Sequence, residues 1–568
     1  MTAAAPSPVV KDYIAIGLGY CEDVVDGRIV AGDLIRKACQ RQLDDLARAH
    51  EGDPDFPYRF DCDKAERVCW FIETLPHIKG KWAKRGETLT LEPWQIFQQI
   101  TLFGWVHVET GLRRFQTAYW EVARKNAKST VAAAMEIFLA TEDGEAGPEV
   151  YTAATKRDQA KIVFDVASEM LKRTPALRAE YQIQVQVHQI KIAGNGGVMK
   201  ALDAKGSTQD GLNPHAAVND EIHAWKGRAL YEVIESAMGA RDQPLNVNIT
   251  TAGFDRSGIC YELRSYGVRV LSGKVRDETF FPVIYTLDKD DDWTDESVWI
   301  KANPNLGVSV FLDGLRVAAN QAKAVKSKRN GFLTKRMNVW CNAATDWLDV
   351  QAWDACAEPG LTLERFRGAT GIYALDLATK KDIASRILWV EQDGLHYLFA
   401  RHYCPEDTVE SGENAAYSGW VEDGWLTTTP GPVIDQNRIK SDLTEDAQIV
   451  EAAEIVFDKW QGAKLMAELD EEGLTVVDLA MSVANMSEPM KELEALVLAG
   501  KVRHQGDPVL SWMMGNIVCF RDEKDNIFPR KDSKDSPRKI DAGVAAIMGM
   551  NRVIAHRDED GSVFVMWA

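Results

Sequence analysis

Residues 120–131, WEVARKNAKSTV, could bind the phosphates of a nucleotide. In a phosphate-binding loop, backbone amides surround the phosphates at a helix N-terminus, a lysine reaches the β- and γ-phosphates, and a Ser or Thr hydroxyl holds Mg²⁺. Lys128 and Ser129 match the end of G-x-x-x-x-G-K-[ST], but Val122 and Ala127 occupy the positions of its two glycines. By itself, this motif favours a basic turn before a helix.

Two later segments could complete a site that hydrolyses a nucleotide. PHAAVNDEIHAW is an apolar strand ending in Asp220 and Glu221, which can place one carboxylate on the Mg²⁺ shell and the next near the attacking water. NVNITTAG ends in Thr250, Thr251 and, two residues on, Gly253, a sequence suited to sensing a γ-phosphate. Both half-motifs follow the loop in the expected order, each at a strand end, so the context favours an ATPase.

Upstream of the loop, the segment LTLEPWQIF offers a possible contact for the base of a nucleotide. Trp94 and Gln95 could line an adenine edge, although such a pair is also common in ordinary packing. We therefore include both residues among the candidate nucleotide contacts.

Three carboxylates in the C-terminal half could bind metal ions for cleaving a phosphodiester. Two-metal nucleases need three or four carboxylates from separate elements, because the metals lie ~4 Å apart and their charge must be balanced. Asp376 interrupts the apolar strand GIYALDLAT, Asp458 ends the strand AEIVFD, and Asp541 opens the helix of KIDAGVAAIMGM. Asp458 could instead be a turn residue and Asp541 a helix cap.

Other polar residues near these carboxylates are secondary candidates. Asp382 and His504 could contact metal or the scissile phosphate, and Lys531 and Lys539 could hold a DNA backbone without reading its sequence. These two lysines belong to a basic stripe near the C-terminus, and a second basic stripe lies within residues 323–336. For either stripe alone, a solvated surface face is the simpler interpretation.

The elements that would position these residues suggest two α/β domains. Apolar strands alternate with helical patterns from about residue 115 to 253, as in a parallel sheet with helices on its faces. A second alternating unit, with a hairpin turn at Asp393 and Gly394, follows Trp347. We expect an N-terminal helical segment at 1–60, a nucleotide-binding domain at 61–310, a basic helical linker at 311–350 and a nuclease domain at 351–568.

Composition limits the class of protein. The 568 residues exceed what one core usually organises, and the net charge of −19 argues against coating nucleic acid by bulk electrostatics. No apolar run approaches the ~18 residues that would span a bilayer, and the N-terminus lacks the pattern of a secretory signal. The nine cysteines are scattered singly, which is typical of reduced thiols. These features predict an intracellular protein without a membrane segment.

The motifs together resemble the large terminase subunits of tailed bacteriophages, in particular a branch whose loop reads Arg-Lys-Asn-Gly-Lys-Ser. EPWQ, NDEIHAW and ITTAG resemble that family's adenine, Walker B and coupling motifs, and LDLATKKD and KIDAGVAAIM resemble its nuclease motifs. The resemblance implies a P-loop ATPase domain with a mostly parallel sheet and a ribonuclease-H-like nuclease domain. It also implies phosphate contacts from the whole loop, with an arginine on the γ-phosphate; the matching residues are Arg124, Lys125, Asn126, Ala127, Lys128, Ser129 and Thr130. Arg241 is a second candidate for that arginine.

The resemblance further implies function and partners. The expected activity is ATP-driven packaging of double-stranded DNA into a procapsid, with endonucleolytic cutting of concatemeric DNA, in the host cytoplasm. Expected cofactors are ATP with Mg²⁺ in one domain and two Mg²⁺ or Mn²⁺ in the other. Expected partners are double-stranded DNA, a terminase small subunit, the portal protein and further copies of the chain, which the resemblance implies form a pentameric ring during packaging. Two alternatives are a nucleic-acid-binding scaffold with a decayed nucleotide site and an ATP-dependent helicase-nuclease.

Overall fold

The computed structural model describes residues 11–561 except 155–156, 204–210, 226, 257, 342–346, 378–381, 412–413, 415, 523 and 532–537. The chain divides into two compact units, the first ending at Trp340 and the second beginning at Cys341, with the short segment 255–257 grouped with the second. Each unit is described separately below.

The first unit contains an eight-stranded sheet in which six neighbouring strands are parallel to one another, while each of the last two strands pairs antiparallel with the strand before it. In sheet order the strands are β10 (Phe280–Ile284), β3 (Thr117–Glu121), β9 (Leu245–Thr250), β8 (Ala216–Asp220), β4 (Glu149–Ala154), β7 (Gly197–Asp203), β6 (Gln189–Ile192) and β5 (Ile183–Val185). A separate two-stranded sheet pairs β1 (Tyr58–Phe60) with β2 (Trp105–His107).

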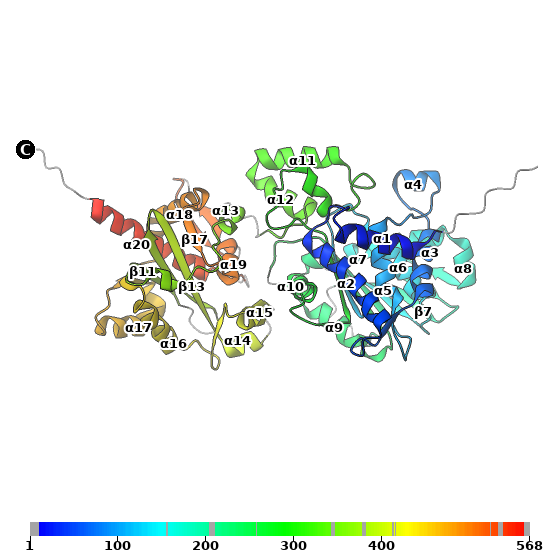
Figure 1. Ribbon diagram of the computed structural model, residues 1–568, viewed down its shortest axis with the longest axis horizontal. Helices are drawn as coiled ribbons and strands as arrows, with labels where there is room; N and C mark the ends of the chain where they lie inside the picture. The colour runs from blue at the N-terminus through cyan, green and yellow to red at the C-terminus, as the bar shows by residue number, and fades with distance from the viewer. Residues whose placement is uncertain are drawn as a thin grey trace, which may run out of the picture. The chain divides into compact units, whose positions relative to one another are not determined.

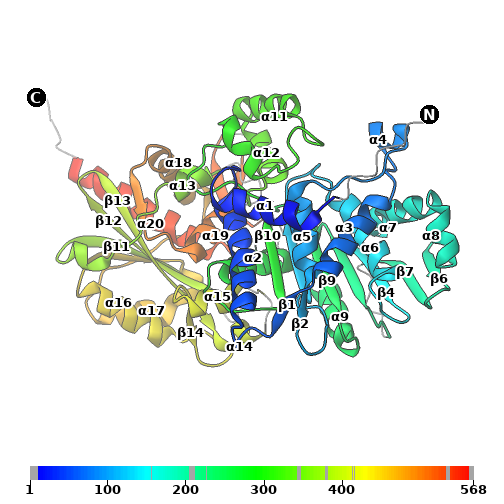
Figure 2. The same cartoon turned by 45° about the vertical axis from the view of Figure 1, so that its right-hand side comes forward.

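Helices cover this sheet on both faces, as Figures 1 and 2 show. The helices of the first unit, not all of which contact the sheet, are α1 (Tyr13–Val25), α2 (Asp33–Glu51), α3 (Cys62–Thr74), α4 (Gly80–Arg85), α5 (Pro93–Gly104), α6 (Lys128–Thr141), α7 (Arg157–Lys172), α8 (Pro175–Glu180), α9 (Ala229–Ala237), α10 (Ile259–Leu271), α11 (Leu312–Ala324) and α12 (Lys326–Arg336). Short 3₁₀ segments occur at η1 (Ile222–Ala224), η2 (Met238–Ala240) and η3 (Glu296–Lys301).

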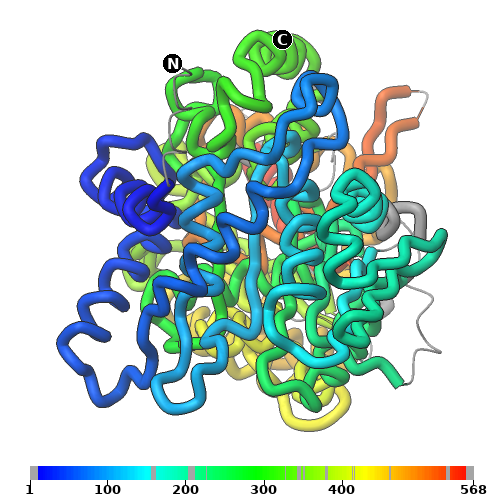
Figure 3. The backbone as a smooth tube through the Cα atoms, turned by 90° about the vertical axis from the view of Figure 1, so that its right-hand side faces the viewer, coloured from blue at the N-terminus to red at the C-terminus, as the bar shows by residue number. Residues whose placement is uncertain are grey.

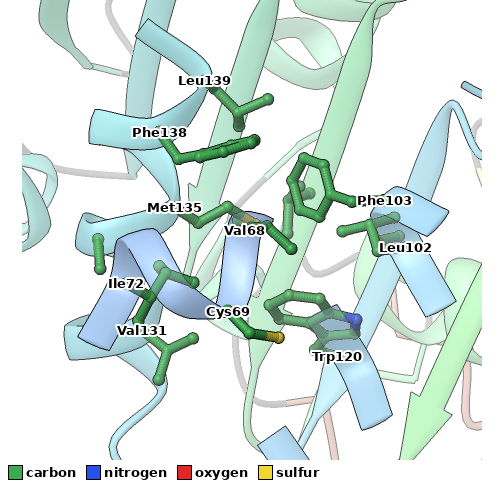
Figure 4. Packing of buried hydrophobic residues seen from close by; sticks show 14 of the residues in the cluster. Val68, Cys69, Ile72, Leu102, Phe103, Trp120, Val131, Met135, Phe138 and Leu139 are labelled. Carbon is green, nitrogen blue, oxygen red and sulfur yellow. The ribbon is translucent and has the colours of Figure 1, made fainter. Parts of the chain in front are cut away.

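Two hydrophobic clusters hold the helices to opposite faces of the sheet. On one face α1, α2, α3, α5, α6 and α7 share a core with alternate residues of β3, such as Ala118 and Trp120. Figure 4 shows the part of this core in which α3, α5 and α6 meet Trp120. On the other face α9, α10 and Trp340 pack against Tyr119 and Ala217. The N-terminal helices therefore belong to the same core as the nucleotide-binding loop.

The second unit contains a mixed seven-stranded sheet. Its main path is β14 (Thr427–Thr429), β13 (Leu395–Pro405), β12 (Ala384–Gln392), β11 (Thr370–Asp376), β15 (Glu451–Phe457) and β16 (Val476–Asp478), and β17 (Val502–His504) also pairs with β13. The predicted hairpin turn between β12 and β13 is confirmed, with φ of 55° at Asp393 and 71° at Gly394. Positive φ at both positions is the geometry of a tight hairpin whose twist matches its strands.

Helices also cover both faces of this second sheet. α18 (Val483–Leu498), α19 (Pro508–Asn516) and α20 (Asp541–Gly561) pack on one face, while α16 (Gln436–Ala447) and α17 (Lys459–Glu471) contribute to the cluster on the other. The remaining elements are α13 (Val350–Asp354), η4 (Leu363–Phe366), α14 (Glu406–Glu410), α15 (Ala416–Glu422) and the hairpin of β18 (Val518–Arg521) with β19 (Ile527–Arg530). The predicted α/β class is confirmed for both units.

Candidate active sites

The carboxyl ends of three neighbouring parallel strands bring together the polar residues of the first unit. β3 leads into the loop at 122–127, β8 ends in Asp220, and β9 ends in Thr250. Because β3, β9 and β8 are adjacent and parallel, their carboxyl ends lie at the same edge of the sheet. α6 then starts at Lys128, so the loop precedes a helix N-terminus, the usual position for a phosphate.

Two residues of the loop have a left-handed backbone although neither is glycine. Lys125 has a φ of 75° and Ala127 has a φ of 63°, both in the left-handed region. For a residue other than glycine this conformation costs about 1–2 kcal/mol. The loop therefore keeps a conformation that glycine would adopt without strain, even though alanine occupies the position.

Lys128 points its ammonium group back into the loop. Its Nζ donates to the carbonyl of Val122 at 2.7 Å and lies 3.4 Å from that of Ala123. Burial lowers the pKa of Lys128, while the nearby charges of Glu221 and Asp220 oppose that change. The ammonium therefore lies near enough to the carboxylates at the end of β8 for their charges to act on it.

Asn126 fixes the loop to a segment far along the chain. Its amide donates to Asn303 Oδ1 at 3.2 Å, and its own Oδ1 accepts from the backbone N–H of Asn305 at 3.0 Å. Asn305 Oδ1 in turn accepts from the indole of Trp94 at 2.7 Å. Sequence reasoning missed both Asn303 and Asn305. The only local feature that could have drawn attention to them is the sequence Asn-Pro-Asn at 303–305.

Trp94 and Gln95 lie in the first turn of α5 and are both buried. Gln95 closes a capping box, its Oε1 accepting from the backbone N–H of Glu92 at 2.9 Å. Trp94 lines a cavity of about 170 Å³ together with Tyr20 and Tyr285. Through Asn305, Trp94 thus connects the loop with this cavity. The side-chain amide of Gln95 instead caps the start of its own helix.

The acidic pair after β8 differs in charge state between its two members. Burial and the charge of Glu221 raise the pKa of Asp220 to about 7. Burial also acts to raise the pKa of Glu221, but contact with His223 and the charge of Lys128 outweigh it and lower that pKa to about 2. Glu221 is therefore ionised at neutral pH and is suited to orienting a water molecule by accepting a hydrogen bond.

The segment 250–253 contacts His223, the neighbour of Glu221. The hydroxyl of Thr250 is 3.0 Å from His223 Nδ1, and Thr251 is fully buried. At Gly253 an added Cβ would lie 3.0 Å from the Cβ of His223 and 3.1 Å from the ring of Trp340. Glycine is needed there because the backbone passes close to these two side chains.

The two candidate arginines lie at different edges of the sheet. Arg124 is exposed within the loop, and its charge contributes to the pKa of Glu221. Arg241 precedes β9 and donates to Glu145 Oε1 at 2.9 Å and to the carbonyl of Asn213 at 3.0 Å. Within one subunit, Arg241 therefore braces the amino end of the sheet, away from the loop.

In the second unit, Asp376 and Asp541 meet beneath the start of α20. Asp376 ends β11, and its side chain faces the same side as Ile372 and Ala374, where α20 packs. Burial and the charges of Asp541 and Asp458 raise the pKa of Asp376 well above its usual range. Burial and the charge of Asp382 raise the pKa of Asp541 to about 6.

Two lysines neutralise part of this acidic group. Lys539 Nζ lies 2.8 Å from Asp382 Oδ1, and Lys531 Nζ lies 3.9 Å from Asp382 Oδ2. Both lysine charges also act to lower the pKa of Asp541. The secondary candidates Asp382, Lys531 and Lys539 thus belong to the same cluster as the main carboxylates.

His504 lies away from that cluster, in the core. Its ring stacks on Trp353 with centroids 4.3 Å apart, and its Nε2 is 2.9 Å from the carbonyl of Trp353. Its Nδ1 accepts from the backbone N–H of Gly506 at 3.2 Å. Both ring nitrogens therefore have structural partners, which does not support the secondary interpretation as a metal or phosphate contact.

Comparison with protein families identifies both units. Residues 93–269 match the family model of the terminase large subunit ATPase domain, and residues 274–557 match that of the terminase large subunit endonuclease domain. The chain belongs to the terminase large subunit family. It is a DNA-packaging ATPase and endonuclease, and the predicted P-loop and ribonuclease-H-like folds, ATP and Mg²⁺ are those of this family.

Relatives of this terminase include phage and bacterial proteins. Protein YmfN of Escherichia coli K12 is 38% identical over 365 residues, covering 62% of this chain and 80% of YmfN. The terminase large subunit of Enterobacteria phage HK97 is 26% identical over 511 residues, covering 88% and 98%. The crystal structure of the HK97 large terminase aligns over 86% of this chain and 99% of that one, with 25% identity and a TM-score of 0.46.

The terminase's acidic residues suit Mg²⁺ as oxygen donors, and some lack partners. Among the described residues, no three His, Cys, Asp or Glu side chains form a ready metal-binding group. However, one buried oxygen each of Asp220 and Asp541 has no hydrogen-bond partner in the described structure. A buried oxygen without a partner is costly, and a cation with its bound water would satisfy it. These carboxylates therefore fit the metal that the family uses.

The terminase also has a buried carboxylate that sequence reasoning missed. Glu121, at the end of β3, is fully buried and accepts from the hydroxyl of Tyr119 at 2.6 Å and from the indole of Trp340 at 3.0 Å. Arg264 lies 3.5 Å away as its counterion. The sequence shows only a glutamate at a strand end, and its partners lie 2 to 219 residues away.

Proposed function

We propose that ATP hydrolysis by this terminase takes place at the carboxyl edge of the first sheet. Lys128 and Arg124 bind the β- and γ-phosphates, with Lys125, Asn126, Ala127, Ser129 and Thr130 providing the surrounding loop and first helical turn. Asp220 and Ser129 hold Mg²⁺, which when bound offsets phosphate charge. Glu221 positions the attacking water. Thr250, Thr251 and Gly253 sense whether the γ-phosphate is present and couple this to the rest of the domain.

One observation supports these roles above the others. Lys128 and the acidic pair Asp220 and Glu221 influence one another's pKa, although about 90 residues separate them in the sequence. Charges buried together in this way are typical of active sites. The cavity beside Trp94 is the proposed adenine pocket, and Gln95 stabilises the helix start that forms its wall.

We propose that Asp376, Asp458 and Asp541 bind the nuclease metals, with Asp382 as a fourth carboxylate. Lys531 and Lys539 are placed to contact the phosphate backbone beside these acids. The metals, when bound, activate water against the phosphodiester. The orphan oxygen of Asp541 and the raised pKa of Asp376 support this assignment, since a bound cation relieves both.

We also propose four segments for this chain and a set of partners. We assign 1–60 to an N-terminal helical segment, 61–310 to the ATPase domain, 311–350 to a basic helical linker and 351–568 to the nuclease domain. The proposed partners are double-stranded DNA, a small terminase subunit, a portal ring and other copies of this chain in a packaging ring, with action in the host cytoplasm. No helix in the described parts of the chain is long and apolar enough to cross a bilayer.

Paired variants test the two sites within one chain. Lys128→Ala and Glu221→Gln should reduce ATP turnover at least 100-fold while leaving plasmid cleavage in Mn²⁺ intact. Asp376→Ala and Asp541→Ala should abolish cleavage while leaving ATP turnover intact. If either pair removed both activities in folded protein, the assignment of separate sites would be wrong. Wild-type protein without ATPase activity would instead support the decayed scaffold.

A further inference from the structure

A closed loop with almost no core projects from the first unit. Residues 76–88, here called the basic loop, are joined at their base by a bridge between Pro76 and Thr88 and by a backbone bond from Leu89 N to the carbonyl of Leu75 at 2.8 Å. α4 forms the tip and contains no buried residue. Figures 1, 2 and 3 all show this segment standing out from the helices around it.

The basic loop carries an unusual charge for this protein. Lys79, Lys81, Lys84 and Arg85 are all exposed, in a chain whose net charge is −19. Arg85 pairs with Glu87 at 3.1 Å. Within the described part of the chain, the three lysines have no carboxylate partner. The loop is therefore a cationic projection on an acidic molecule.

Contacts among its own side chains hold the basic loop in shape. The ring of Trp82 stacks on that of His77 with centroids 5.2 Å apart and an angle of 18°. Lys81 Nζ lies 4.8 Å from the Trp82 ring and 5.7 Å from that of Phe311, which is 55% exposed. Gly80 takes a φ of 76°, which permits the turn into α4.

These features of the basic loop are more typical of a surface that binds a partner than of an element that stabilises the fold. Ordering a backbone costs about 1–2 kcal/mol per residue, which core burial normally offsets. The tip of the basic loop buries no side chain, so it adds little to the stability of the fold. Compact surface loops closed at their base in this way frequently serve binding.

We propose that the basic loop grips the phosphate backbone of the double-stranded DNA that the motor moves. The inference rests on the packaging function, and it adds a contact in the ATPase half. Lysine ammonium groups on flexible stems act as point charges, which suit phosphates in any sequence. A packaging motor needs such sequence-independent contacts, because it must hold each new stretch of DNA in turn.

An acidic protein partner fits the basic loop less well. Protein interfaces usually have a buried apolar centre surrounded by a polar rim. The large apolar side chains at the tip of the basic loop are the half-buried Trp82 and the neighbouring, exposed Phe311. Its main chemical feature is positive charge, which a nucleic acid backbone matches best.

The test compares two triple variants of the full chain. Lys79→Ala, Lys81→Ala and Lys84→Ala together remove the lysines of the basic loop. The matched control is Lys191→Ala, Lys274→Ala and Lys289→Ala, which removes three exposed lysines elsewhere in the first unit. Binding to a fluorescent duplex of arbitrary sequence is measured by anisotropy in EDTA, so that no cleavage occurs, at several salt concentrations.

We expect the loop variant to bind DNA about tenfold more weakly at ~0.1 M salt, and the control to bind as the wild type does. The slope of log K against log salt should become shallower by about 2–3, since each lost phosphate contact removes ~0.9. Thermal unfolding and basal ATP turnover without DNA should be unchanged. Wild-type affinity and slope in the loop variant, or an equal loss in the control, would overturn the proposal.

A failure of the DNA-packaging function itself would give a different result in the same binding experiment. Wild-type protein that binds no duplex at any salt concentration would contradict DNA packaging and the proposed grip together. Loss of binding to an immobilised acidic protein, with DNA affinity unchanged, would show that the basic loop contacts protein and would also overturn the DNA proposal.

Discussion

The Nδ1 of His223 lies 3.0 Å from a carboxylate oxygen of Glu221 and 3.0 Å from the hydroxyl of Thr250. A single, partly exposed ring thus lies between Glu221 and the end of β9. In the proposed mechanism, this contact would link the residue that positions water to the segment that responds to the γ-phosphate.

Replacing His223 should slow hydrolysis without abolishing nucleotide binding. His223→Ala removes the contact that holds Glu221, and we expect kcat for ATP to fall about 10- to 100-fold, or ~1.4–2.7 kcal/mol in activation free energy. Binding of a fluorescent ATP analogue should change less than threefold. His188→Ala, at an exposed position, is the control. An unchanged kcat would mean that Glu221 is held by other groups.

Restoring glycine in the loop should stabilise the first unit. Ala127→Gly relieves the left-handed strain at φ 63°, worth about 1–2 kcal/mol, and loses part of this to the greater freedom of the unfolded chain. We expect a net gain of about 0.5–1 kcal/mol in the denaturation transition of the ATPase unit. Ala133→Gly, in the middle of α6, should instead destabilise by about 1 kcal/mol. A loss of stability in both variants would contradict the backbone strain at Ala127.

Glu136 should make the stability of the first unit depend on pH. Burial raises its pKa to about 8, aided by the charge of Asp220 and opposed by a hydrogen bond from Thr152. The folded state holds a proton there that the unfolded state releases near pH 4.5, so stability should be full below about pH 5 and decrease up to pH 8. The slope is at most ~1.4 kcal/mol per pH unit.

The measurement for Glu136 is thermal unfolding of the ATPase unit between pH 5 and pH 9. Glu136→Gln cannot lose a proton, so its stability should decrease less over this range than that of the wild type. Glu180→Gln, on the exposed face of α8, should follow the wild-type curve. Parallel curves for wild type and Glu136→Gln would show that Glu136 titrates normally.

Removing one of the proposed nuclease carboxylates should abolish the stabilisation of the second unit by metal. Asp376→Asn relieves repulsion by Asp541 and Asp458, so without metal its Tm should equal or exceed that of the wild type. Addition of Mg²⁺ or Mn²⁺ should raise the wild-type Tm, because a ligand bound only to the folded state stabilises it, and should leave the variant unchanged. Asp393→Asn, in the distant hairpin turn, should respond as the wild type does.

Much of the architecture is visible in the sequence because it depends on local patterns. Alternating strand and helix patterns predicted two α/β units, and the same patterns placed Lys128 before a helix and Asp220 and Thr250 at strand ends. Neighbouring parallel strands place their carboxyl ends together, so strand ends alone bring these residues near one another. Asp376 was identifiable because a carboxylate within an apolar strand needs a partner.

Only the tertiary structure decided which residues hold these groups in place. Asn303 and Asn305 reach Asn126 across about 180 residues, and nothing in their local sequence marks them as partners of the loop. His504 was drawn into the core by stacking on Trp353. A sequence pattern records local geometry and burial, whereas the choice of hydrogen-bond partner depends on which distant segments the completed core brings into contact.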